Sequence, residues 1–102
     1  MPIEEEEFSS PEPNLIVSRH GFSVEVSLPS RLVYAEADRR MDIFAETLVR
    51  PGIQIAVRRS DVKAWHGPQP QAGVTEVERS RIIDNIRKAF ESRDWILVVE
   101  PI

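Results

Sequence analysis

Two histidines, His20 and His66, are the residues of this 102-residue sequence best suited to proton transfer. His66 follows Ser60 and Asp61 within one short segment, so the residue types of a nucleophilic triad are present. A triad needs its nucleophile, base and acid to be fixed by separated elements, and one short segment does not supply that geometry. His20 precedes Gly21 in a predicted turn. We therefore predict that the chain is not an enzyme.

Metal and cofactor chemistry also lacks a starting point in the sequence. Cysteine is absent, which excludes thiolate ligands, thiolate nucleophiles and disulfides. The four glycines are isolated from one another, so no phosphate-binding loop is present. The densest group of carboxylates lies in a segment too mobile to hold fixed ligand positions: Glu4, Glu5, Glu6 and Glu7. We expect neither a metal nor a cofactor.

Two arginine pairs, Arg39-Arg40 and Arg58-Arg59, are the candidates for contacts with phosphate. Successive residues of a strand face opposite sides of a sheet, so each pair offers one arginine per face. No aromatic residues interleave with the pairs, as a platform for single-stranded nucleic acid requires. A small nucleic-acid-binding or regulatory module is kept as the alternative function, although nucleic acid is not the expected partner.

The negative charge is concentrated at the N-terminus. Residues 1–12 contain five acids and no base, whereas the other ninety residues contain twelve acids and thirteen bases. The body of the chain is therefore nearly neutral, which argues against a broad basic face for nucleic acid. The acidic segment either steers the protein toward a basic partner or serves solubility alone, and both interpretations stay open.

The elements that must position these side chains begin after the acidic segment. Residues 1–13 are rich in glutamate, serine and proline, and we expect a flexible acidic arm there. Structure should begin near Asn14, with residues 14–102 forming a single α+β domain. Strand-like runs at 15–17 and 22–28 flank His20-Gly21, which has the composition of a hairpin turn.

Residues 31–49 fit two different patterns. Helical spacing links Val33, Ala37, Met41, Phe44 and Leu48. Strand alternation runs instead through Met41, Ile43, Ala45, Thr47 and Val49. We favour two strands joined by a hairpin at 37–40, with a helix as the alternative.

The rest of the chain predicts a strand, one helix and a final strand. Residues 53–58 alternate, and Thr75 with Glu78 forms a capping box that starts a helix over 75–92. The apolar stripe of that helix is Ile82, Ile83, Ile86, Ala89 and Phe90. Residues 95–99 are apolar throughout, which is typical of a strand buried on both faces. The predicted fold is α+β: a mostly antiparallel sheet, built as a meander of hairpins, with the amphipathic helix packed on one face.

Trp65 lies after the strand at 53–58 and before a loop that contains Pro68, Pro70 and Gly73. An indole in this position either closes one end of the core or anchors a protein contact. We favour the core position and keep the anchor as the alternative.

The order of these features along residues 31–99 carries a resemblance. A strand at Ala45-Glu46 is followed by a turn at Gly52, the segment Val62-Lys63-Ala64-Trp65, the Pro68 loop and the Thr75 helix start. This order resembles the immunity protein 74 family of bacterial polymorphic-toxin and contact-dependent growth inhibition systems. The acidic arm is not part of that pattern. The resemblance implies a cytoplasmic immunity protein, or antitoxin, that binds the C-terminal domain of a cognate toxin, often a nuclease, and blocks its active site or substrate path.

The resemblance transfers no contact residues, so the candidate partner-binding residues are chosen on physical grounds. Trp65 and His66 offer an aromatic anchor beside a polar loop. Acids that could face a basic nuclease are Asp42, Glu46, Glu4, Glu5, Glu6 and Glu7. The apolar runs are too short to span a membrane, and the N-terminus lacks the pattern of a signal peptide. We expect a cytoplasmic protein that is a monomer or a weak dimer before it meets the toxin.

Overall fold

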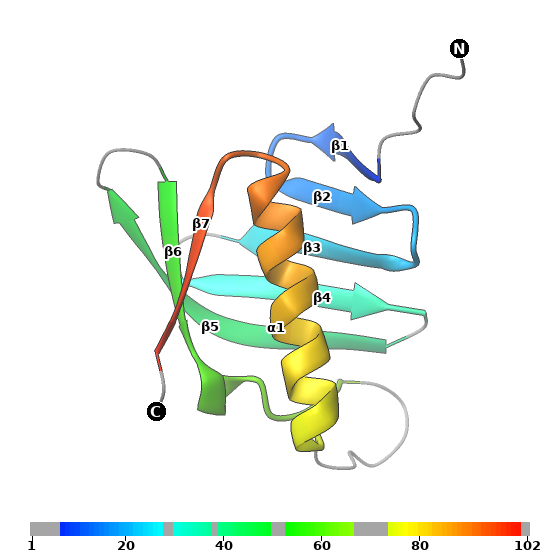
Figure 1. Cartoon of the computed structure of the whole chain (residues 1–102), viewed down its shortest axis with the longest axis vertical. Coiled ribbons are helices and arrows are strands. Elements are labelled where there is room, and N and C mark those ends of the chain that lie inside the picture. The colour runs from blue at the N-terminus through cyan, green and yellow to red at the C-terminus, as the bar shows by residue number, and fades with distance from the viewer. Residues whose placement is uncertain (1–6, 28–29, 38, 50–52, 67–73, 101–102) are drawn as a thin grey trace.

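The computed structural model describes residues 7–27, 30–37, 39–49, 53–66 and 74–100. Within these residues, seven strands form one sheet in chain order, and one α-helix packs across a face of it (Figure 1). The elements are β1 (Phe8–Glu12), β2 (Leu15–Ser18), β3 (Phe22–Ser27), β4 (Arg31–Glu36), β5 (Arg39–Val49), β6 (Ile53–Arg58), the 3-10 turn η1 (Arg59–Asp61), α1 (Glu76–Glu91) and β7 (Ile96–Glu100).

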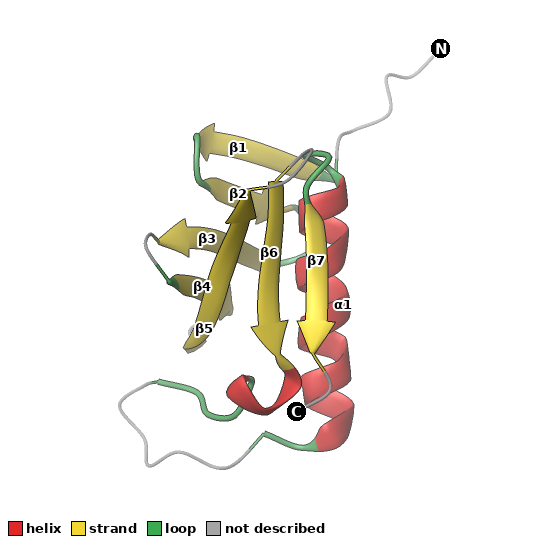
Figure 2. Ribbon diagram, turned by 90° about the vertical axis from the view of Figure 1, so that its left-hand side faces the viewer, coloured by secondary structure: helices red, strands yellow, loops and turns green. Residues whose placement is uncertain are grey.

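Neighbouring strands are antiparallel from β1 to β6, whereas β6 and β7 are parallel. A parallel pair needs a crossover, and α1 supplies it. The long strand β5 pairs with β4 along Arg39–Phe44 and with β6 along Ala45–Val49. The sheet bends at this strand, so that β2–β4 cross α1 while β6 and β7 run along it (Figures 1 and 2). The predicted α+β fold is confirmed.

Residues 31–49 form two strands, as the alternating pattern favoured. Met41, Ile43 and Ala45 are buried on the face that α1 covers, and the residues between them lie on the opposite face. Ala37 has a φ of 53°, a left-handed value that lets the chain reverse between β4 and β5. Gly21, with a φ of 101°, makes the equivalent reversal between β2 and β3, where the hairpin was expected.

Helix α1 begins where its capping box predicts. Thr75 accepts a hydrogen bond from the Glu78 amide at 3.1 Å, and the Thr75 amide donates to the Glu78 carboxylate at 3.4 Å. The apolar stripe of the helix is buried against the sheet in full: Ile82, Ile83, Ile86, Ala89 and Phe90. Together with inward side chains of β2–β7, this stripe forms the core.

Two expectations about the ends of the chain are wrong. Structure begins at Phe8 and not near Asn14, because β1 pairs with β2 and Phe8 packs edge-on against Phe22 at 6.0 Å. The expected arm therefore contains a strand, and its residues 1–6 lie outside the described residues. The last strand is not buried on both faces: β7 is an edge strand, and Ile96 is exposed.

Candidate partner-binding surface

The sheet has two unlike faces, which we call the inner face, covered by α1, and the outer face, on the other side. Figure 2 shows that α1 lies entirely to one side of the strands. Strand alternation assigns each residue to a face, and the register of the strands carries that assignment across the sheet. The residues predicted from the sequence are divided between these two faces.

Trp65 belongs to the core. Its side chain is 6% exposed, its ring lies 6.1 Å from the ring of Tyr34, and the guanidinium of Arg39 lies over it at 4.1 Å. Its Nε1–H is buried and has no hydrogen-bond partner among the residues that the structure describes. The indole thus closes one end of the core, which is the position favoured from the sequence.

A group of polar side chains, which we call the Glu36 cluster, surrounds this end of the core: Tyr34, Glu36, Arg39, Arg81 and Asn85. The Glu36 carboxylate accepts from the Tyr34 hydroxyl at 2.6 Å, from Arg39 at 3.1 Å and from Arg81 at 2.5 Å. Asn85 donates to the Tyr34 hydroxyl at 2.9 Å. Burial, reinforced by the bond to Glu36, raises the pKa of Tyr34 well above its usual range. The cluster fastens α1 to the hairpin of β4 and β5.

His66 lies close to Trp65 in sequence but has a different environment. Its side chain is exposed, and its backbone amide donates to the Arg40 carbonyl at 2.6 Å. This bond makes an isolated bridge beside the start of β5. His66 therefore lies on the rim of the strand that carries Asp42 and Glu46.

Asp42 and Glu46 both project from the outer face of β5. They are four residues apart on one strand, a separation of about 13 Å, with Phe44 on the same face between them. Asp42 forms an ion pair with Arg31 at 3.4 Å, whereas Glu46 is exposed. Phe44 is 49% exposed. The structure thus places an accessible aromatic ring between two of the predicted carboxylates.

The position of Phe44 in the strand pattern of residues 41–49 is a sequence signal for its exposure. Its spacing fits the helical pattern at 31–49, and that pattern treats it as a core residue. Once 41, 43 and 45 are assigned to the core face of a strand, Phe44 must lie among the outward charged residues. A large apolar residue in that phase of an alternating strand indicates a contact surface.

The outward residues of the neighbouring strands β6 and β7 are mixed: Ala56, Ile96 and Val98 are apolar, whereas Gln54, Arg58 and Glu100 are polar. Glu46 is the pairing partner of Ala56, and Ala56 is the partner of Val98 in β7. Ile96, on the same face of β7, is 49% exposed. We call this group the outer patch: Phe44, Glu46, Ala56, Ile96 and Val98.

The fourth tail glutamate, Glu7, lies far from this patch. It is exposed, and its carboxylate lies 3.8 Å from the His20 imidazole. Strand β1 is four strands away from β5, about 19 Å along the sheet. Glu4, Glu5 and Glu6 lie outside the described residues. The predicted acids therefore do not form one group.

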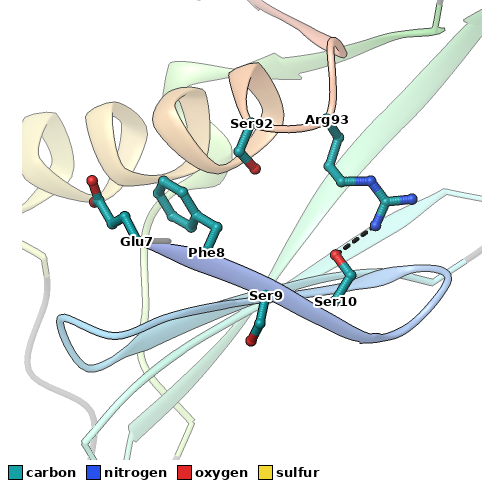
Figure 3. Close-up of a pocket in the computed structure, with 6 residues that line it drawn as sticks. All are labelled: Glu7, Phe8, Ser9, Ser10, Ser92 and Arg93. Atoms are coloured by element: carbon teal, nitrogen blue, oxygen red, sulfur yellow. Dashed lines mark hydrogen bonds between the residues drawn. The ribbon is translucent and has the colours of Figure 1, made fainter. Parts of the chain in front are cut away.

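Glu7 instead lines a groove of about 490 Å³ between β1 and the end of α1. Figure 3 shows Phe8 directed toward the helix and Ser9 directed away from it. Arg93 donates to the Ser10 hydroxyl at 2.5 Å and stacks over Trp95 at 5.1 Å. The Ser92 hydroxyl donates to the Ala89 carbonyl at 2.6 Å. The Arg93–Ser10 bond thus joins β1 to the segment that follows α1.

A second hollow, of about 450 Å³, opens where the two parts of the sheet separate. Its lining is mainly apolar: Pro13, Asn14, Val26, Thr47, Ile53, Ile55 and Trp95. The Asn14 side chain donates to the Val26 carbonyl at 2.9 Å and ties the β1–β2 turn to the end of β3. This cleft marks the end of the core that α1 does not cover.

The arginine pairs are split as strand alternation predicts. Arg39 forms ion pairs with Glu36 and Glu78, and Arg59 forms one with Glu76. The bond from Arg59, together with the one from Arg79, lowers the pKa of Glu76 below its usual value. Arg40 and Arg58 are exposed on the outer face. In each pair, one arginine thus forms ion pairs within the fold and the other is exposed on the outer face.

Within the described residues, no group of three or more histidine, aspartate or glutamate side chains is placed to hold a metal. The same part of the chain contains no helix long and apolar enough to cross a membrane.

A family model, immunity protein 74, matches residues 23–100. The match spans well over half of the 102 residues. The chain belongs to the immunity protein 74 family. Membership indicates an immunity, or antitoxin, role, and it implies a cognate toxin protein as the partner of this family member. The matched range runs from β3 to β7 and so includes the whole outer patch. No curated protein and no solved structure matches the chain.

Proposed function

We propose that this immunity protein neutralises the C-terminal domain of a cognate toxin by stoichiometric, non-covalent binding. The complex blocks the active site of the toxin or the path of its substrate. Such a mechanism requires a preformed complementary surface and no reactive group, because affinity at an interface depends on hot-spot quality and charge matching. The toxin is delivered by a contact-dependent growth inhibition system, and neutralisation takes place in the cytoplasm.

The observation that carries this proposal is the outer face of the sheet, which no helix or strand among the described residues covers. Regular hydrogen bonding across β4, β5, β6 and β7 fixes the positions of the outward side chains before any partner arrives. Phe44 projects from this face between two carboxylates. Preorganisation of this kind lowers the entropy cost of association.

A nuclease is the toxin class that suits these charges best. Nucleases bind the phosphate backbone through basic surfaces, and an acidic protein surface is complementary to them. Glu46 and Glu7 are exposed carboxylates of the immunity protein, and Glu4, Glu5 and Glu6 add charge to the sequence. Opposite fields also raise the rate of encounter, which favours rapid neutralisation of a toxin that enters the cell.

The proposal is tested by producing the immunity protein in cells together with the C-terminal domain of the protein that the neighbouring gene encodes. Cells that produce the domain with the intact immunity protein should grow, whereas cells with a stop codon early in the immunity gene should die. Plating efficiency measures the difference. Equal killing in the two strains would show that the chain does not neutralise that domain.

A further inference from the structure

The outer patch differs from the rest of the outer face. On β3 and β4 the outward residues are mostly polar: Ser23, Glu25, Ser27 and Arg31. Val33, the large apolar residue among them, is only 7% exposed and pairs with Glu25 and Asp42. Phe44 and Ile96 are each 49% exposed. Among the described residues of the outer face, the exposed large apolar side chains are therefore Phe44 on β5 and Ile96 on β7, with the buried Ala56 and the half-buried Val98 beside them.

Glu46 gives the patch a charge. It lies between Phe44 along the strand and Ala56 across it, and it is exposed. Among the described residues, its carboxylate forms no ion pair. Asp42, on the same strand, is held by Arg31 at 3.4 Å, so it has less capacity to attract a second cation. Arg58 faces outward two residues from Ala56, so the surroundings of Glu46 include one cation as well as Phe44 and Ala56. A carboxylate attracts a cation more strongly once a partner excludes water from it.

We propose that the outer patch is the docking face for the cognate toxin domain. The toxin presents an arginine or lysine to Glu46, beside an apolar hollow that accepts the ring of Phe44. This inference rests on the proposed function and adds the location and chemistry of the contact. Phe44 acts as the anchor, and Ala56 and Val98, which lie level with Glu46 on β6 and β7, exclude water on one side of the ion pair.

The test measures the affinity of the purified immunity protein for the neighbouring gene's C-terminal domain, made by cell-free synthesis. Phe44→Ala should weaken binding by about thirtyfold or more, the effect of an interface hot spot. Glu46→Lys should weaken it by about tenfold or more, and its penalty should shrink at high salt. The matched controls are Val77→Ala, at a position 81% exposed on α1, and Glu91→Lys, at the exposed end of the same helix. Both controls should bind as the wild type does.

The outcomes separate this inference from the proposed function. If the wild type binds and Phe44→Ala and Glu46→Lys bind equally well, the toxin docks elsewhere and the inference is wrong while the function stands. If the wild type neither binds nor protects, the function itself is wrong. A concentration-dependent dimer that Phe44→Ala dissolves would assign the patch to a second copy and also overturn the inference. Circular dichroism of each variant checks that the variant is folded, so that unfolding is not mistaken for a loss of binding.

Discussion

The two faces of one sheet show what a covered surface and an uncovered surface look like in the same protein. On the inner face, Met41 and Ile43 are fully buried beneath α1. On the outer face, Phe44, the residue that follows Ile43, keeps about half of its surface in water. The backbone, the strand and the neighbours are shared, so the difference arises from the helix. The exposed ring of Phe44 is therefore available for contact with another molecule, as the proposed docking face requires.

The largest expected effect is a loss of stability, and it appears when a residue of the core is compared with a residue of the outer patch. Ile86→Ala, in the buried stripe of α1, should lower the free energy of unfolding by about 2–5 kcal/mol, because it leaves a cavity. Phe44→Ala should lower it by only about 1 kcal/mol, because its ring is half solvated already. Urea unfolding followed by circular dichroism measures both values. Equal losses would show that Phe44 belongs to the core.

The second comparison sets a sheltered carboxylate, Glu36, against a more accessible one, Asp42, whose side chains are 16% and 34% exposed. Glu36→Gln should lower the free energy of unfolding by about 1–3 kcal/mol, because it weakens the hydrogen bonds that the carboxylate accepts from one hydroxyl and two guanidinium groups beside the core. Asp42→Asn breaks one solvated ion pair on the outer face and should cost less than about 1 kcal/mol.

Salt provides the control for this pair of variants. Raising the salt concentration should reduce the effect of Asp42→Asn more than that of Glu36→Gln, because exposed charges are screened more strongly. The same urea titrations, repeated at high salt, measure the change. An Asp42 effect as large as the Glu36 effect would mean that the outer face also carries structural charge.

The smallest effect concerns the ion pairs at the start of α1. Arg59 and Arg79 lower the pKa of Glu76 in the folded protein below its usual 4.5. The folded state thus favours the ionised form, and this stabilisation is present above pH 4.5 and lost as pH falls through the folded pKa. The stability difference between wild type and Glu76→Gln should therefore narrow below that pH. A difference that stays constant on acidification would contradict the account, and Glu91→Gln serves as the control.

Much of the inner face could be predicted from the sequence, because the apolar residues of each element there follow a single spacing, that of a helix or that of a strand. The capping box at Thr75 located α1, and the alternation at 41, 43 and 45 located β5. The sequence prediction missed β1, because Pro11 and the irregular register between Ser9 and Glu12 hide the strand pattern. It located β7 but wrongly predicted that the strand is buried on both faces, because an apolar run does not reveal whether a strand lies at an edge.

The candidate site was harder to predict than the fold. Which residues share a face is fixed locally, but the face that α1 leaves uncovered is fixed only by tertiary packing. Asp42 and Glu46 were selected for their charge, and the structure places both on the outer face. Trp65 was kept as an anchor, yet burial beneath Arg39 leaves its ring little accessible surface. Phe44 was overlooked because a helical stripe could also contain it.

Carboxyl footprinting of the immunity protein, free and bound to the toxin domain, tests the central claim most directly. Mass spectrometry would compare the labelling of Glu46 and Glu100, on β5 and β7, with that of Glu25 and Glu91, on β3 and α1. We predict that binding protects Glu46 and Glu100 and leaves Glu25 and Glu91 unchanged. Protection of Glu25 or Glu91, with Glu46 still labelled in the complex, would contradict the assignment of the outer patch as the docking face.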